Sequence, residues 1–532
     1  MLSDIVGFIN GKIYVSFNPV RRASGLVVNR GKILYVGTSG KAKDLANALD
    51  GKVVDLGGSI VMPGFVDAHM HLDSLGFSLS SLNLRNTQSI KELNNLLKKF
   101  YDEHKSSSWI IGRGWDQELF REKRWPTRWD IDEVVPDVPV MLTRVCGHAA
   151  VVNTKALEII DLPQNILESS YFHKNEKGLP TGVVLEGAVE LFRSKIKFSM
   201  KEIEKMLSQA LAYATSLGVT TVGFMSCNLA TFASLQSLRL RRTLPVRVRT
   251  YMSEGLDLIS TLGIGRSFGD EYLKIMGIKL FVDGSLGART ALLSKPYNDD
   301  ASTLGTLVTE KQNLVSMVRK AHENKLQVAI HAIGDAAVDV ALEAYSTLGS
   351  NLEKYRHRIE HASIVRPEQV KKMAKLGVCA SVQPHFTISD WWIESRVGKE
   401  RVLWAYPFRS MIKSKVKVGF STDSPVEPLN PWETVYAAVT RGEDTDFSNY
   451  SSKEKLSLKE ALFCYTIGSA YLLFEEKNVG SLEEGKYADF IVINKDPFEV
   501  DLEELKNMKT LMTVVAGKIM YKSPKLKDIA SF

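Results

Sequence analysis

The stretch PGFVDAHMHL, residues 63–72, decides the fold. A short apolar run leads into it and ends in two histidines, His69 and His71, that are one residue apart. Side chains two positions apart on a β-strand point to the same face, so both imidazoles could bind one metal ion. Two histidines on one strand can also be packing or surface residues. The pair therefore indicates a metal site only in combination with reactive residues further along the chain.

Runs rich in Val, Ile and Phe alternate with helical patterns through the middle of the chain, as a parallel α/β fold requires. Eight such runs are strand candidates: 60–69, 218–225, 246–253, 274–284, 326–334, 356–363, 377–384 and 416–424. Helical patterns fit between them at 232–242, 312–325 and 367–377. Eight strand-then-helix units predict an α/β fold of the (β/α)8 TIM-barrel class.

The rest of the chain predicts two additions to this barrel. Short β-rich runs with glycine turns fill residues 1–61 and return at 480–522, so residues 1–61 and 475–532 are expected to build one small β-sandwich domain beside a barrel domain at 62–474. The segment between the first two strand candidates is far longer than the about 30 residues of one βα unit. It predicts an insertion at about 75–195, placed to act as a substrate lid.

Composition and charge exclude several classes of protein. With 532 residues and 44% hydrophobic content the chain has ample material for a core. Lys plus Arg exceed Asp plus Glu by only 68 to 61, without clustering, so nucleic acid is not an expected partner. The start MLSDIVGFING lacks signal-peptide features, and no run approaches eighteen apolar residues. We expect a cytoplasmic protein without a membrane partner.

Reactive side chains recur at or near the ends of the strand candidates, where TIM barrels carry their active sites. Six of them would converge on the barrel axis: His69, His71, Lys279, His331, His361 and Asp423. Neutral imidazole suits zinc and similar ions, and the aspartate adds an oxygen donor. The lysine does not fit this set as an ammonium, because it has no lone pair and repels a metal.

This pattern resembles the amidohydrolase superfamily over almost the whole chain. The resemblance rests on PGFVDAHMHL, GIKLFVDGSLGARTA, VAIHAIGDAA, HRIEHAS, GFSTDSPVEP and GSLEEGKYADFIVIN. Within that superfamily the chain is most similar to the branch that includes N-substituted formamide deformylase. The stretches GRGWDQ, RVCGHAAVVNTKAL and GLPTGVVLE are also typical of that branch.

The resemblance implies a centre of two zinc ions. His69 and His71 would bind the more buried ion with Asp423, two later histidines would bind the outer ion, and Lys279, carbamylated by CO2, would bridge both. The later histidines are His331 and His361. A metal-activated hydroxide would then cleave the C–N bond of a small amide, N-formyl or cyclic amide substrate, with Asp423 as general base and then acid. The family also implies a possible homodimer.

Further residues are candidates for contacts around this centre. The expected substrate contacts are His148, Asp283, His385 and Trp115, and a structural hydrogen bond is the alternative interpretation for the histidines. Asp283 shares strand parity with Lys279 and should lie near the barrel mouth. Glu360 has the opposite parity to His361, so it should face the helices and pair with Arg358.

The segment 385–412 is the expected source of substrate specificity together with the insertion. Its aromatic side chains indicate an apolar or aromatic substituent on the substrate: Trp391, Trp392, Trp404, Tyr406 and Phe408. The same residues could instead belong to the core or to a contact surface.

Two other functions remain open at this point. A mononuclear deaminase of the same superfamily commonly lacks the strand-four lysine and carries a glutamate acid after strand five. This chain has Lys279, and after His331 it offers Asp335 but no glutamate until Glu343. A non-catalytic barrel used as a binding scaffold is the other alternative. It is disfavoured because six polar groups at a buried site are costly to retain without a function.

Overall fold

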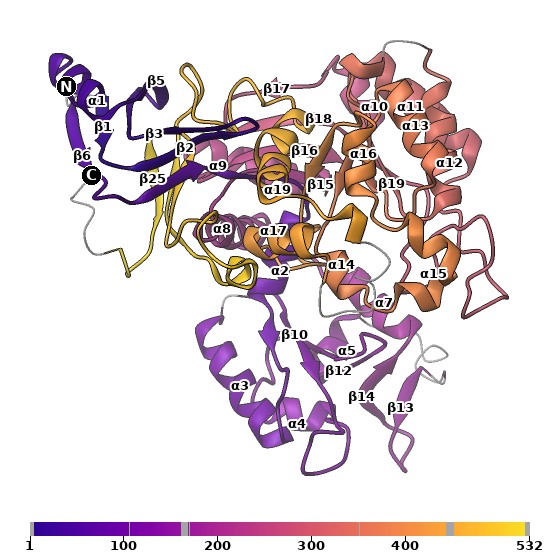
Figure 1. The fold of residues 1–532 in the computed structure, drawn as a ribbon. Coiled ribbons are helices and arrows are strands. Elements are labelled where there is room, and N and C mark those ends of the chain that lie inside the picture. Colours follow the sequence, from indigo (N-terminus) through magenta and orange to yellow (C-terminus); the bar gives the residue numbers. More distant parts are fainter. Residues whose placement is uncertain are drawn as a thin grey trace. The chain divides into compact units, whose positions relative to one another are not determined.

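The computed structural model describes residues 5–105, 107–160, 169, 171–349, 352–442 and 452–526. Its contacts divide the chain into two compact units. One comprises Met1–Leu75 with Ala210–Phe532, and the other comprises Gly76–Gln209. Figure 1 traces the chain from the indigo N-terminus to the yellow C-terminus.

Eight parallel strands in the first unit form the predicted barrel, and they follow one another in sequence order. They are β8 (Phe65–Met70), β15 (Val219–Cys227), β16 (Arg247–Met252), β18 (Leu273–Phe281), β19 (Gln327–Ala332), β20 (Arg358–His361), β21 (Cys379–Val382) and β22 (Val418–Phe420). A short β17 (Phe268–Gly269) pairs with β18. All eight predicted strands are therefore present, and the TIM-barrel prediction is confirmed.

The first and last strands meet at their carboxyl ends. The backbone N–H of Asp423 donates to the carbonyl of His69, and the N–H of His71 donates to the carbonyl of Ser424, each over 2.8 Å. All six residues of β8 are buried, as expected for a parallel strand covered on both faces. The ring thus closes at the residues that were predicted to bind metal.

Helices follow the strands on the outside of the barrel (Figure 1). In chain order they are α9 (Leu229–Leu240), α10 (Leu256–Thr261), α11 (Lys311–Glu323), α12 (Asp335–Ser346), α13 (Pro367–Leu376), α14 (Phe386–Ser389), α15 (Ile393–Arg401), α16 (Phe408–Lys413), α17 (Pro431–Thr440), α19 (Leu458–Phe463) and α20 (Ser469–Leu472). Local signals set their ends: Asn228 accepts the N–H of Thr231 and starts α9, whereas Gly377, at φ 71°, ends α13. Among the described residues, no helix has the length and apolar character that crossing a membrane requires.

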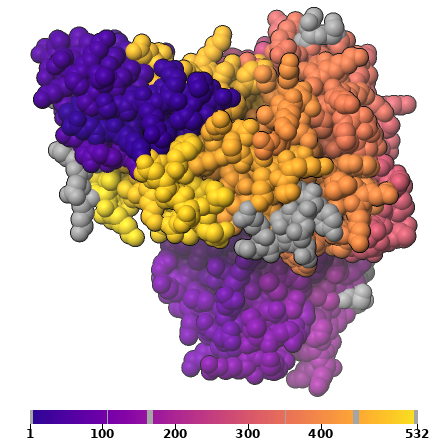
Figure 2. Space-filling model, viewed as in Figure 1, coloured from indigo at the N-terminus to yellow at the C-terminus, as the bar shows by residue number. Residues whose placement is uncertain are grey.

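Both chain termini contribute to the same pair of sheets. A six-stranded sheet has the order β25 (Lys518–Lys522), β24 (Thr510–Val515), β23 (Phe490–Ile493), β7 (Ile60–Pro63), β2 (Lys12–Phe17) and β3 (Val20–Ala23). A four-stranded sheet has the order β5 (Lys32–Gly37), β4 (Gly25–Asn29), β1 (Ile5–Ile9) and β6 (Lys52–Asp55). One apolar cluster joins Phe8 and Leu26 to Phe490 and Val514. The N-terminal and C-terminal segments accordingly lie side by side (Figure 2).

The run at 60–69 is two strands, and the expectation of a single strand there is wrong. Residues Ile60–Pro63 pair in the six-stranded terminal sheet, and Phe65–Met70 pair in the barrel. Gly64 separates them, and a Cβ at this position would lie 2.2 Å from the side chain of Thr220. Both strands are buried, so the apolar pattern contains no sign of the break other than the Pro-Gly pair.

The unit Gly76–Gln209 has its own sheet and its own core. Its strand order is β13 (Phe172–Lys174), β14 (Pro180–Leu185), β12 (Ala149–Val152), β11 (Val140–Arg144), β10 (Ile110–Trp115) and β9 (Leu82–Asn83). Its helices are α3 (Ile90–Glu103), α4 (Arg128–Asp132), α5 (Thr154–Ile160) and α7 (Gly187–Lys195). The helices α2 (Leu72–Ser80) and α8 (Met200–Ser216) run across its two boundaries. Two apolar clusters, one around Leu142 and one around Val184, give this unit a core on each face of the sheet.

Buried ion pairs connect the barrel to the C-terminal segment. Arg247 on β16 donates to both carboxylate oxygens of Asp489 over 2.7 and 3.0 Å, and both side chains are at most 1% exposed. Arg249 on the same strand pairs with buried Glu475 over 2.9 Å. Removing one member of such a pair leaves the other charge buried and unpaired.

We therefore expect Asp489→Asn to lower the free energy of unfolding by about 3–5 kcal/mol, because the charge of Arg247 loses its partner. Thermal and urea unfolding would measure the loss. Arg21→Ala is the matched control, since Arg21 and Glu483 form an exposed pair at 3.1 Å, worth about 0–1 kcal/mol. Equal losses in the two variants would contradict the structural role assigned to the buried pair.

Candidate metal centre

Three of the predicted ligands converge on one point. His69 lies in β8, His71 follows that strand, and Asp423 lies in the loop after β22. The Nε2 atoms of His69 and His71 are 3.2 and 3.0 Å from Oδ1 of Asp423. Ligand atoms about 2.0–2.2 Å from one zinc ion are roughly 3.0–3.5 Å from each other. The three side chains therefore have the spacing of a metal-binding site.

Two of these atoms lack another partner. Within the described part of the chain, Nε2 of His69 and Oδ1 of Asp423 are buried and make no hydrogen bond. A buried polar atom without a partner costs about 1–3 kcal/mol. Burial raises the pKa of Asp423, but the His69 and His71 imidazoles outweigh it and hold that pKa well below its usual value. A carboxylate and two imidazole nitrogens thus fit a divalent cation.

Glu360 controls which nitrogen of His69 is available. Nδ1 of His69 donates to Oε2 of Glu360 over 2.5 Å, and Nε of Arg358 lies 2.5 Å from Oε1 of the same carboxylate. Burial raises the pKa of Glu360, but the charge of Arg358 and the hydrogen bond from His69 lower it well below its usual value. A carboxylate on Nδ1 leaves Nε2 with its lone pair and makes the imidazole a stronger ligand.

The predicted pairing of Glu360 with Arg358 is present, but the predicted orientation of Glu360 toward the helices is wrong. Glu360 contacts His69 inside the barrel. The strand conformation ends at the next residue, because His361 and Ala362 have φ angles of 72° and 45°. Side-chain parity no longer relates Glu360 to His361 once the backbone leaves the extended region.

Asp423 also has a left-handed backbone, with φ at 58°. Conformations of this kind cost about 1–3 kcal/mol each in residues other than glycine, and they cluster at functional sites. Two of the six predicted ligands, His361 and Asp423, therefore lie on strained backbone at the carboxyl ends of their strands.

His331 and His361 form a second group beside the first. The ring centroid of His361 lies 4.5 Å from that of His331 and 4.9 Å from that of His69. Nδ1 of His361 donates to the side-chain oxygen of Gln383, and Nε2 of His331 donates to the carbonyl of Gly284, each over 2.9 Å. Each ring keeps its second nitrogen for another ligand.

Burial keeps this second group uncharged. It lowers the pKa of His331 to about 3, with repulsion from Lys279, and it lowers the pKa of His361 well below its usual value. Lys279 is only 2% exposed, and burial lowers its pKa to about 8 against the attraction of Glu360 and Asp423. Neutral imidazoles can bind metal, and a neutral amine is the form that reacts with CO2.

Asp283 lies beside His331, with Oδ1 3.5 Å from Nε2. Its carboxylate accepts the backbone N–H groups of Leu292, Ile333 and Gly334 over 2.9–3.0 Å. Burial raises the pKa of Asp283 to about 7, although these N–H groups favour the charged form. The residue thus organises the loops after β18 and β19, and its contact with substrate stays a prediction.

His385 lies in the segment after β21 and is held by a carboxylate that the sequence motifs did not single out. Its Nδ1 donates to Oε2 of Glu427, and the hydroxyl of Ser389 donates to Oε1 over 2.6 Å. Glu427 follows Asp423 by four residues in the same loop. The His385 side chain is 15% exposed and stands on the rim that carries Asp423, so a substrate contact stays a prediction.

The two other candidates lie in the unit Gly76–Gln209. Trp115 is fully buried in the core, and its Nε1 donates to the carbonyl of Leu142 over 2.7 Å. Its ring has no surface left for a ligand, which corrects the expectation of a substrate contact. The His148 side chain is 72% exposed and its Nδ1 lies 3.1 Å from Glu186, so its role stays a prediction.

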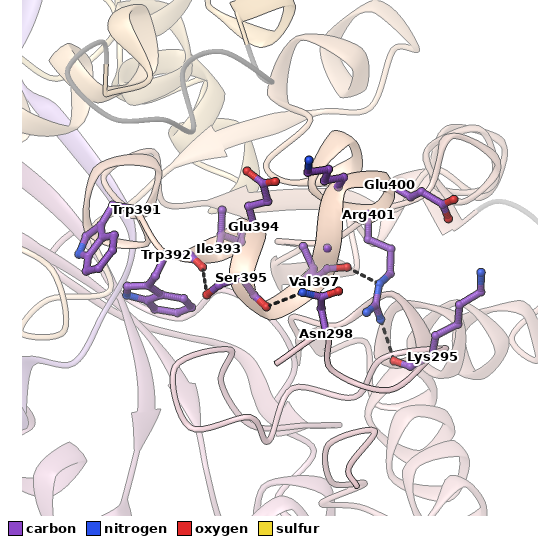
Figure 3. Close-up of a pocket in the computed structure, with 12 residues that line it drawn as sticks. Lys295, Asn298, Trp391, Trp392, Ile393, Glu394, Ser395, Val397, Glu400 and Arg401 are labelled. Atoms are coloured by element: carbon purple, nitrogen blue, oxygen red, sulfur yellow. Dashed lines mark hydrogen bonds between the residues drawn. The ribbon is translucent and has the colours of Figure 1, made fainter. Parts of the chain in front are cut away.

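A cavity of about 780 Å³ lies between α15 and residues 295–298, in the segment that was expected to set specificity (Figure 3). Trp391 and Trp392 lie at one end of it, and Arg401 points toward Lys295 at the other. Trp391 is 66% exposed, whereas Tyr406 and Phe408 belong to the core.

One short loop connects this cavity to the second histidine group. The carbonyl of Gly284 accepts the His331 hydrogen bond, and three residues later Gly287 packs against Trp392, since a Cβ there would lie 3.7 Å from the ring. The cavity therefore borders the loop that holds His331.

A model of the amidohydrolase family matches residues 52–521. The chain belongs to this family. Two relatives match over nearly the full length: the putative amidohydrolase YtcJ of Bacillus subtilis (strain 168) is 30% identical over 96% of this chain and 98% of its own. The N-substituted formamide deformylase of Arthrobacter pascens is 26% identical over 94% of this chain and 95% of its own.

A solved structure gives the same result in three dimensions. The crystal structure of an uncharacterized metal-dependent hydrolase from Pyrococcus horikoshii OT3 is 43% identical, covers 94% of this chain and 99% of its own, and superposes with a TM-score of 0.84. The resemblance predicted from the sequence motifs is confirmed. This amidohydrolase is accordingly a metal-dependent hydrolase with a candidate metal site at His69, His71 and Asp423.

We expect Glu360→Gln to weaken binding of a divalent ion about 10- to 100-fold. A charged carboxylate accepts the Nδ1–H of His69 and so keeps the lone pair on Nε2, whereas an uncharged amide holds that tautomer less strongly. Titration of zinc against a chelator of known affinity would measure it. Glu343→Gln serves as the matched control, since that side chain is exposed and pairs with Lys311. Unchanged zinc affinity in Glu360→Gln would exclude the role assigned to this carboxylate.

Proposed function

We propose that this amidohydrolase cleaves the C–N bond of a small amide, N-formyl amine or cyclic amide. The observation that carries the proposal is the convergence of His69, His71 and Asp423, in which two buried atoms have no other partner. The deformylase relative supports the choice of bond.

We propose further that the centre takes two divalent ions, with zinc as the expected metal. His69, His71 and Asp423 would hold one ion, and the second group would hold the other through His331 and His361. Lys279, as a carbamate formed with CO2, would lie between them. When bound, the ions lower the pKa of a water molecule and polarise the substrate carbonyl.

Asp423 is suited to move the proton of the reaction. As a carboxylate it can accept a proton from the attacking water as the new C–O bond forms. It then returns this proton to the nitrogen as the C–N bond breaks, which releases an amine and a carboxylic acid. The backbone hydrogen bond from Asp423 to His69 keeps this carboxylate beside the imidazoles.

His385 and Glu427 are proposed to position the substrate. The Glu427 carboxylate fixes the proton of His385 on Nδ1, so Nε2, which lies 3.8 Å from Oε2 of Glu433, keeps a lone pair that can accept a hydrogen bond from the substrate. The cavity beside Trp392 would take the substituent on the substrate nitrogen, since an aromatic wall binds apolar groups.

The contacts of Asp335 argue against the mononuclear deaminase. This residue accepts the N–H of Ser294 over 2.9 Å and pairs with Arg366 over 3.2 Å. It is therefore committed to the loops and is not free to act as the acid after strand five. Buried Lys279 beside two uncharged histidines also favours a carbamate-bridged pair of ions.

The first test is turnover of N-formyl amines whose nitrogen substituents range from methyl to aromatic. We expect release of formate, loss of activity after metal removal with a chelator, and recovery on adding zinc. Lys279→Ala should lower kcat by about 10²–10⁴, the range typical of removing one group central to catalysis.

Metal analysis and carbon-13 NMR in labelled bicarbonate would test the centre itself. Two ions and a carbamate signal that Lys279→Ala removes are expected. One ion without the signal, together with release of ammonia from an amino-substituted ring, would favour the deaminase. Absence of bound metal in the purified protein would contradict the hydrolase.

A second test concerns the His385 and Glu427 pair. We expect His385→Gln and Glu427→Gln each to lower kcat/KM about 10- to 100-fold, and the double variant to lose no more than either alone, because both act through one hydrogen bond. Metal content should stay unchanged. Additive losses, or loss of the metal, would show that the pair does not work as a unit on the substrate.

A further inference from the structure

Two adjoining cavities lie at the amino-terminal end of β18, and we name them together the cationic groove. The larger has a volume of about 640 Å³ and the smaller about 310 Å³, and both are lined by Glu271, Tyr272 and Lys518. The other walls come from the four-stranded terminal sheet, the turn between β24 and β25, and the end of α9.

Unpaired positive charge dominates this groove. Within the described ranges, five of its cations are exposed and have no carboxylate at ion-pair distance: Arg30, Lys32, Lys52, Arg242 and Lys518. Among the described lining residues Glu271 is the one carboxylate, and it already pairs with Arg239 over 3.2 Å. Like charges around one hollow repel one another, and an anion in the hollow would relieve that repulsion.

A buried and electrically satisfied ion pair lies beneath two tyrosines of the lining, Tyr272 and Tyr487. The Arg247 guanidinium lies 3.8 Å from the ring centroid of Tyr487 and 5.2 Å from that of Tyr272, while Asp489 neutralises its charge. The ammonium group of Lys32 also lies over Tyr487, 5.2 Å from the centroid of its ring. The charge available to a ligand therefore comes from the walls.

The groove is separate from the metal centre. Tyr272 precedes β18, and Lys279 lies seven residues further along that strand, which corresponds to about 23 Å at 3.3 Å per residue. Reactive groups of TIM barrels lie at the carboxyl ends of the strands. A ligand in the groove would consequently not compete with the substrate.

We propose that the cationic groove binds a small multivalent phosphate anion, of the class of a di- or triphosphate. Lysine and arginine side chains are the usual partners of phosphate oxygens. The larger cavity falls within the range of about 300–1,000 Å³ that small-molecule sites occupy. Its cations come from separate segments that meet at one hollow, which suits a compact ligand better than a long polymer.

Binding of tripolyphosphate to the intact, metal-loaded protein tests this proposal. Isothermal titration at low salt should show saturable binding, with a higher melting temperature as ligand is added and weaker binding at high salt. The double variant Lys52→Gln/Lys518→Gln should raise the Kd at least tenfold. Lys371→Gln/Lys375→Gln is the matched control, because it removes two exposed lysines from α13, away from the groove.

The control double variant also separates binding in the groove from removal of metal. If polyphosphate acted only by chelating the metal, it would give the same titration with both double variants. Equal Kd values in the two variants, or no saturable binding, would overturn the proposal. Tighter binding of a long oligonucleotide than of tripolyphosphate, lost in the groove variant alone, would replace the small anion with nucleic acid. Unchanged melting temperatures of both ligand-free variants establish that the fold is intact.

Discussion

The buried contact between Glu360 and His69 is the interaction on which the site depends. Arg358 makes it possible, because its guanidinium neutralises Glu360 and also donates to the carbonyl of Ala68 over 2.8 Å while lying 4.6 Å from the ring of Tyr251. A carboxylate without that partner would be too costly to bury. With it, Glu360 stays charged and holds His69 in the one tautomer that presents Nε2.

Closure of the barrel and assembly of the metal site use the same few residues. The two backbone hydrogen bonds that join β8 to the loop after β22 start or end at His69, His71, Asp423 and Ser424. The left-handed backbone of Asp423 turns its carboxylate toward the imidazoles. The strain is retained because packing and hydrogen bonds around this loop determine the conformation more strongly than the local preference of the residue.

The two ends of the barrel have different chemistry. The carboxyl ends collect imidazoles, carboxylates and one buried lysine, whereas the amino-terminal ends carry the buried pairs of Arg247 and Arg249 with the C-terminal segment. The first pair joins β16 to the residue that precedes β23 of the terminal sheet, and the second joins β16 to the segment between α20 and β23. Beside them, in the part of the chain that the structure describes, the exposed cations of the cationic groove have no carboxylate at ion-pair distance, which is the observation behind the proposed anion.

The sequence by itself determined the barrel, its eight strands and the ligand candidates, because buried parallel strands give apolar runs and reactive residues stand at their ends. It could not show that residues 60–69 belong to two sheets, since both strands are equally buried. It also placed Glu360 on the wrong face, because strand parity fails where His361 turns to positive φ. The motif around Trp115 suggested a ligand contact, but its indole ring is packed inside a core.

Only the tertiary structure decided the hydrogen-bond partners of the imidazoles, which are Glu360, Gln383 and Glu427. Hydrogen bonds between residues far apart in the chain leave no periodic pattern in the sequence.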